Sequence, residues 1–131
     1  MVYEETVALD LPFGEALAAV KLALAECGFG TLTEIDLQQT LHAKIGKEMG
    51  RYVIIGACNP KLAGAAIDVE PMVGVLLPCN VVVREVGERV YVDAMDPGLM
   101  ATMTGAEALQ PIATEARQLV NEALRMVASR G

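Results

Sequence analysis

The chain has 131 residues, of which 53 % are hydrophobic and 21 % charged, and its formal net charge is -7. This length fits one domain, and the apolar content excludes disorder and low complexity. The acidic balance leaves no basic face for a nucleic acid or an anionic membrane, so it argues against both partners. We therefore expect a single domain over residues 1–131.

The mean hydropathy of +0.41 is high for a protein outside a membrane. The most apolar stretch is interrupted by Lys21 and Glu26, well short of the roughly 20 residues that a membrane span needs. No basic segment followed by an apolar one opens the sequence, so we predict a soluble cytoplasmic protein. The surplus apolar residues need cover, which predicts a homodimer. Three cysteines without CxxC spacing predict reduced thiols.

The first half of the chain alternates between strand and helix patterns. Residues 2–9 alternate apolar and polar, with Val7 and Leu9 on one face and Thr6 on the other, which is typical of a half-buried strand. Pro12 and Gly28 mark the start and end of a helix, and Asp36 is the expected N-cap of a shorter one. The predicted elements are a strand at 2–9, a helix at 12–27, a strand at 31–35, a helix at 36–44 and a strand at 51–57.

The second half begins with a helix start signal, because Asn59 suits the N-cap and Pro60 the first helical position. Residues 72–77 form either a helical turn or an extended apolar loop. Thr104 and Glu107 match a capping box ahead of the last helix, whose regular part starts near Gln110. The predicted elements are a helix at 60–67, strands at 78–86 and 89–95 joined at Gly87, an apolar connection at 99–103 and a last helix from 110.

The order of predicted elements is β-α-β-α-β-α-β-β-α. Strands that follow one another through a hairpin, with helices between the others, are typical of α+β domains. We expect a mostly antiparallel sheet with helices packed on one face.

Two Cys-Asn pairs, each next to a proline, are the most informative feature of the sequence. Because the chain has only three cysteines, two such pairs are improbable by chance. Cys58 precedes a predicted helix, whose N-terminus stabilises a thiolate and binds anions through free N–H groups. The motifs predict a ligand pocket, and the candidate residues are Cys58, Asn59, Pro60, Pro78, Cys79 and Asn80.

Two other readings of the cysteines stay open. Cys58 and Cys79 are equally suited to filling a core, and Cys27 is expected to be buried. Alternatively, Cys58 and Cys79 hold a soft metal or form a redox pair. His42, on its short helix, is expected to be exposed and away from the cysteines, so no metal site and no catalytic residue is assigned. The carboxylates weighed as further metal ligands are Asp68, Glu70 and Asp96.

Three segments of the sequence resemble a known family, the domain of unknown function 302. They are Gly28–Asp36 (GFGTLTEID), Gly56–Pro60 (GACNP) and Leu76–Val83 (LLPCNVVV). The resemblance covers nearly the whole chain. It implies a compact single α+β domain, homodimeric, with no assigned activity and no catalytic residue.

Three functions follow from these patterns. The leading one is a homodimeric module that binds a small acidic or apolar molecule near the two Cys-Asn motifs, without catalysis and with no cofactor identified. The second is a thiol-based redox or soft-metal protein that uses Cys58 and Cys79. The third is a structural or partner-docking domain, because methionines adapt to irregular surfaces. The methionines concerned are Met95, Met100 and Met103.

Overall fold

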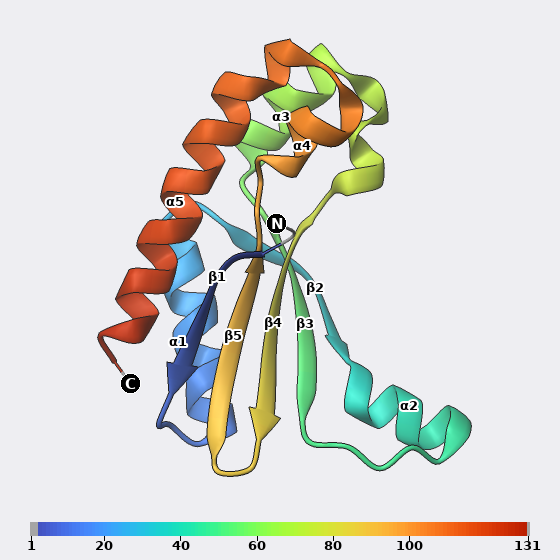
Figure 1. Ribbon diagram of the computed structural model, residues 1–131, viewed down its shortest axis with the longest axis vertical. Helices are drawn as coiled ribbons and strands as arrows, with labels where there is room; N and C mark the ends of the chain where they lie inside the picture. The colour runs from blue at the N-terminus through green and yellow to red at the C-terminus, as the bar shows by residue number, and fades with distance from the viewer. Residues whose placement is uncertain (1–2, 131) are drawn as a thin grey trace.

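The computed structural model describes residues 3–130, and the side chains of residues 6–130. Its strands form one sheet in the order β1-β5-β4-β3-β2, and every neighbouring pair is antiparallel (Figure 1). The strands are β1 (Tyr3–Leu9), β2 (Gly30–Asp36), β3 (Tyr52–Cys58), β4 (Cys79–Val86) and β5 (Arg89–Met95). The predicted α+β class with a mostly antiparallel sheet is confirmed.

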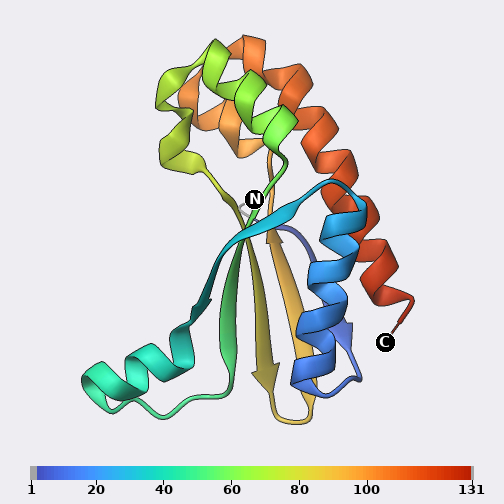
Figure 2. The same ribbon diagram turned by 180° about the vertical axis from the view of Figure 1, so that it is seen from behind.

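Helices α1 (Phe13–Glu26) and α5 (Gln110–Ala128) cover one face of the sheet (Figure 2). Alternate residues of the central strands point toward them, such as Val81 and Val83 of β4, which are buried. The buried residues of α5 recur at helical spacing along one stripe of the helix. They are Ala113, Ala116, Val120, Ala123, Leu124 and Val127, and the last four belong to the core between the sheet and the helices.

A second group of helical segments lies beyond the end of the sheet at which β3 and β5 end (Figure 1). We call it the cap. Its members are α3 (Pro60–Val69), the 3-10 turn η1 (Pro71–Leu76), α4 (Leu99–Thr104) and the 3-10 turn η2 (Glu107–Leu109). The cap and the start of α5 share a core of their own, separate from the core between sheet and helices. Helices therefore cover one face of the sheet, as predicted, and also close one of its ends.

Helix α2 (Leu37–Ile45) lies apart from both groups, beyond the opposite end of β2 (Figures 1 and 2). The Oδ1 atom of Asp36 accepts a hydrogen bond from the Gln39 N–H at 3.0 Å, which confirms Asp36 as the N-cap. Gly46 ends the helix, as expected.

Two predictions about residues 99–107 are wrong. Residues 99–103, which we expected to be an apolar connection, form most of helix α4, with Met100 and Ala101 buried in the cap core. The Thr104–Glu107 capping box does not form. Thr104 is the last residue of α4, and its hydroxyl donates to the Met100 carbonyl at 2.5 Å and accepts from the Ala106 N–H at 3.1 Å. Residues 99–104 become helical because Met100 and Ala101 are buried in the cap core, and this core exists only in the folded chain.

The other predictions of secondary structure agree closely with the structure. Residues 71–76 take the helical alternative, as η1, and α5 begins at Gln110. Gly87 has a φ of 60°, which the two-residue loop between β4 and β5 requires. Val2, placed in the first strand, lies outside the described residues. In the described part of the chain, no helix combines the length and apolar character needed to cross a membrane.

Candidate functional site

The two Cys-Asn motifs lie side by side at the end of the sheet below the cap. Strand β3 ends at Cys58, and strand β4 begins at Cys79. The register pairs Ala57 with Cys79 and Gly56 with Asn80. Antiparallel neighbours bring the end of one strand to the start of the other. The strand that ends at Cys58 is therefore the sheet partner of the strand that begins at Cys79.

Asn59 and Pro60 build the start of α3. The Asn59 Oδ1 atom accepts from the Leu62 N–H at 3.2 Å, and Pro60 is the first helical residue. This confirms the predicted cap. The amide nitrogen of Asn59 lies beside Gly28, 3.0 Å from the place where a Cβ atom would stand. Asn59 thereby joins the start of α3 to the end of α1.

The second motif is held against Gly56. The Leu77–Pro78 peptide bond is cis, and the Cγ atom of Pro78 lies 2.7 Å from the place of a Cβ atom on Gly56. Thr33 of β2 approaches the same place from the other side. Asn80 is exposed on the sheet face that α1 and α5 do not cover. Strand β3 thus has no room for a side chain at Gly56.

One pocket brings parts of both motifs together. Its volume is about 20 Å³, which is enough for one water molecule or a group of similar size. Of the six predicted residues, Cys58, Asn59 and Cys79 line it, whereas the other three, two prolines and Asn80, do not. The complete lining is Phe29, Ala57, Cys58, Asn59, Leu62, Ala63, Leu77, Cys79, Met100 and Ala116.

The pocket lies on the seam between the two hydrophobic cores. Phe29 and Ala57 belong to the core between sheet and helices, and Met100 belongs to the cap core. Cavities of this kind, between two packed units, are common ligand sites.

The two pocket thiols differ in exposure. Cys58 is half-buried and Cys79 is buried, and both are free. Burial, and to a smaller extent the nearby Cys58, raises the pKa of Cys79 from its ordinary 9.0 to about 11. Cys79 is therefore a neutral thiol at pH 7. Because the unfolded thiol ionises first as the pH rises, the free energy of unfolding should fall between pH 9.0 and about 11.

We expect a thiol reagent to label Cys58 faster than the two buried cysteines of the native protein. Access limits the reaction of buried thiols, and the raised pKa of Cys79 keeps its thiolate fraction low. Labelling followed by peptide mass spectrometry would assign each rate. The Cys58→Ser variant should lose the fast phase, and Cys27→Ser should keep it. A fast phase that survives Cys58→Ser would contradict this order.

The other candidate ligands lie elsewhere. Cys27 is buried, with its Sγ atom 3.8 Å from the Sδ atom of Met126, which confirms its core position. Its pKa is raised by burial and by nearby Glu122 and Glu26. His42 is exposed on α2, as predicted, with its Nε2 atom 3.4 Å from a Glu48 oxygen. Among the side chains that the structure describes, those of residues 6–130, no three of His, Cys, Asp or Glu are placed to share a metal ion.

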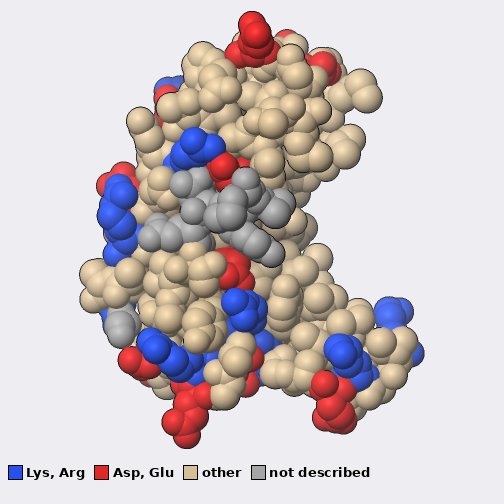
Figure 3. All heavy atoms as spheres, viewed as in Figure 1, with Lys and Arg blue, Asp and Glu red and all other residues tan. Residues whose placement is uncertain are grey.

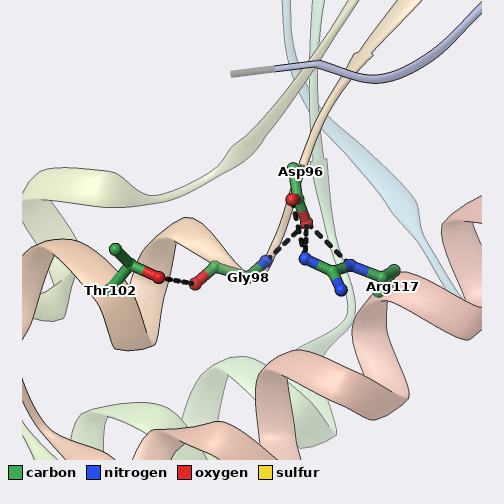
Figure 4. Close-up of polar contacts among 4 residues, drawn as sticks. All are labelled: Asp96, Gly98, Thr102 and Arg117. Carbon is green, nitrogen blue, oxygen red and sulfur yellow. Dashed lines mark hydrogen bonds and ion pairs between the residues drawn. The ribbon is translucent and has the colours of Figure 1, made fainter. Parts of the chain in front are cut away.

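An ion pair that the sequence analysis did not foresee lies beside the seam (Figure 4). The carboxylate of Asp96 accepts from the Gly98 N–H at 2.8 Å and from the Arg117 guanidinium at 2.7–2.9 Å. Thr102 donates to the Gly98 carbonyl at 3.2 Å, which ties the first turn of α4 to the same point. Asp96, considered above as a metal ligand, therefore connects β5, α4 and α5.

The sequence contains a signal for the Asp96 side of this junction, but not for the Arg117 side. Asp96-Pro97-Gly98 is recognisable as a turn, and aspartate before a turn commonly accepts the N–H group two residues on. Nothing local identifies Arg117 as the partner, because it occupies one of several exposed polar positions of α5. The pairing depends on how α5 crosses the end of β5.

A larger hollow lies on the surface of the cap, with a volume of about 360 Å³. Its apolar members Met72, Val75 and Met103 are 74 %, 85 % and 66 % exposed. Of the three methionines expected to serve docking, Met103 is thus at the surface, whereas Met100 is in the cap core. The hollow is lined by Glu70, Met72, Val75, Leu76, Met103 and Thr104.

Comparison with known proteins identifies the same family as the sequence motifs. Residues 5–127 match the family model "Domain of unknown function DUF302". Among solved structures, the chain is similar to an uncharacterised conserved DUF302 protein from Bacillus stearothermophilus. The TM-score is 0.88 at 25 % identity, and the match covers 96 % of this chain and 98 % of that one. No curated protein matches the chain.

Proposed function

Since the chain belongs to the DUF302 family, whose name assigns no activity, we propose its function from the geometry of the site. The protein is a homodimeric module that binds a small molecule in the pocket at the seam between sheet and cap. The observation that supports this function is the meeting of both Cys-Asn motifs at that pocket. Residues brought together from two strands around a space between two cores are the usual components of a ligand site.

The lining of the pocket indicates an apolar ligand, or the apolar end of a larger one. It combines aliphatic side chains, one aromatic ring and two thiols, with Asn59 as the one carboxamide. Asn59 uses its oxygen to cap α3, so its amide N–H groups are the donors suited to a polar group of the ligand. Because the closed pocket holds about 20 Å³, a ligand larger than one small group requires the seam to open.

We base the homodimer on the apolar surface of the chain. Hydrophobic residues make up 53 % of the chain, and several large ones remain at the surface of the described residues. A second copy is the simplest cover for such surface. The most exposed of these side chains are Leu32, Ile45, Met72, Val75 and Met103. The free cysteines fit the cytoplasmic location that we propose for the protein.

The thiol-based alternative is weaker. A nucleophilic or metal-binding cysteine acts as the thiolate, and the pKa of Cys79 near 11 opposes that form. The partner-docking alternative is favoured by one observation, the hollow on the cap with its exposed methionines. Occupation of that hollow by another protein would leave the seam pocket unaffected.

The seam pocket is tested by filling it. Ala63 and Ala65 are both half-buried on α3, but only Ala63 lines the pocket. We expect native mass spectrometry of reduced, tag-free protein to find added mass on the wild type and on Ala65→Leu, and none on Ala63→Leu. The leucine would occupy the space of the ligand without changing the helix propensity much.

Circular dichroism would verify that both variants fold. Freshly purified wild type without added mass, or Ala63→Leu retaining it, would contradict the proposed pocket. Added mass that a Cys58→Ser variant alone removes, and that reductant releases, would instead identify a thiol adduct and favour the second function.

A further inference from the structure

Helix α2 lacks the packing that a short helix needs. It has nine residues, from Leu37 to Ile45, and none of them is buried. Its contacts are with the start of β3, and Gln38 Nε2 donates to the Met49 carbonyl at 3.1 Å. Isolated helices below about 12–15 residues are marginal in water, because tertiary packing supplies most helical stability. A partner that covers α2 would supply the packing that stabilises this helix.

The strand that leads into α2 is equally uncovered. Strand β2 is an edge strand of the sheet, and six of its seven residues are exposed. Its side chains Leu32 and Ile35 are 64 % and 45 % exposed, and Ile45 on α2 is 70 % exposed. An exposed edge with aliphatic side chains is a template for pairing with another chain.

The molecule has a recess that could hold the α2 segment of a second copy. We call α2 and the loop after it, residues 37–51, the α2 arm. Figure 3 shows the outline hollowed between the cap above and the α2 arm below, at the β2 edge of the sheet (Figure 1). The same chain thus has a projecting arm and a recess on one edge. A two-fold axis at that edge would bring each arm into the recess of the other copy.

The charges of the two regions are complementary. Residues 37–51 contain three basic side chains and one acidic one, although the whole chain has a net charge of -7. The cap segments 60–76 and 99–109 contain one basic side chain and three acidic ones. Opposite charges facing each other set the orientation of an interface and exclude wrong partners. The bases are Lys44, Lys47 and Arg51, and the acids of the cap are Asp68, Glu70 and Glu107. Because the Arg51 guanidinium lies over the Phe13 ring at 4.3 Å, Lys44 and Lys47 are the bases of the arm suited to face a partner.

We infer that a second copy of the chain covers the α2 arm, which rests on the homodimer proposed above. The β2 edges of the two copies face each other across a two-fold axis. The α2 arm of each copy lies against the cap of the other, with Ile45 facing the exposed Met72 and Val75. The arm of one copy is the occupant that the cap hollow of the other is shaped to receive.

Sedimentation velocity over a concentration series tests this interface. The expected result is a wild-type dimer whose dissociation constant rises at least about tenfold in Ile45→Glu and in Val75→Lys, since each change buries a charge against apolar groups and places it opposite charges of the same sign. Leu22→Glu is the matched control. Leu22 is 47 % exposed on α1, away from the arm and the cap, and its substitution should leave the dimer unchanged.

Hydrogen exchange of the wild type gives an independent readout. The amides of residues 37–45 should be protected at high protein concentration and lose protection on dilution, because the dimer holds α2. A monomeric wild type would overturn both the homodimer and this interface. A dimer that Ile45→Glu and Val75→Lys leave intact, with α2 amides unaffected by dilution, would overturn this interface alone.

Discussion

Gly56→Ala is expected to destabilise the protein by about 3 kcal/mol, at the upper end of the range for an overpacked core. Gly56 lies in β3, between its partners Thr33 of β2 and Asn80 of β4. A methyl group there would overlap the Thr33 hydroxyl and stand 2.7 Å from the Pro78 Cγ atom. The proline ring cannot rotate away, so the strands themselves must separate.

Thermal and denaturant unfolding would measure the effect, which corresponds to roughly a 10 °C lower melting temperature. Gly64→Ala is the matched control, because Gly64 lies within α3 with no atom within 4 Å of the added Cβ. That substitution should raise the free energy of unfolding by about 0.5–1 kcal/mol through helix propensity. If the two variants unfold at the same temperature, the close approach at Gly56 is wrong.

Asp96→Ala is expected to lower the free energy of unfolding by about 2–3 kcal/mol. The Asp96 side chain is only 17 % exposed, and it accepts hydrogen bonds from both Arg117 and the Gly98 amide. Its removal takes away the shared acceptor of the Arg117 guanidinium and the Gly98 N–H, and so unties the first turn of α4 (Figure 4). Charge-assisted and bidentate bonds of this kind are the strong ones among protein hydrogen bonds.

Asp10→Ala is the control for a change of charge alone. Asp10 pairs with Arg89 at 3.3 Å, but the two side chains are 69 % and 50 % exposed. Exposed ion pairs contribute less than about 1 kcal/mol, so this variant should unfold close to the wild type. Denaturant titrations of both variants, with Asp96→Asn as a third, would separate charge from hydrogen bonding. Equal losses for Asp96→Ala and Asp10→Ala would refute the structural role of Asp96.

The Asp96 junction also bears on the seam pocket. Asp96 joins the end of β5 to α4 and, through Arg117, to α5, and α4 and α5 supply Met100 and Ala116 to the pocket lining. We therefore expect Asp96→Ala to accelerate the labelling of Cys79, because it removes a connection that holds α4 and α5 at the end of β5.

Local signals in the sequence predict most of the secondary structure. Asp36 and Asn59 each cap a helix through their own side-chain oxygens, and Pro60 occupies the first helical position. Such signals act within a few residues, so they survive without knowledge of the fold. Residues 99–103 are wrongly predicted because they contain no such local signal. Their apolar, methionine-rich composition fits several conformations, and only burial in the cap core selects a helix.

The candidate site also combines features that local sequence predicts with features that depend on the folded chain. The repeated Cys-Asn pairs mark the end of the sheet below the cap, and strand adjacency brings the pairs together. The sequence does not distinguish the members that line the pocket, such as Cys79, from exposed ones such as Asn80. That distinction depends on the pleat, which points successive side chains to opposite faces, and on where the cap lies.

The sequence alone determines the α+β class, the order of most elements, the helix caps at Asp36 and Asn59, and the position of the two Cys-Asn motifs. Each of these depends on neighbouring residues or on a period of two or 3.6 residues. Tertiary structure decides the separate cap core, the Asp96–Arg117 junction and the uncovered α2 arm. These features arise from contacts between segments far apart in the chain, and no local pattern encodes which distant side chains will meet.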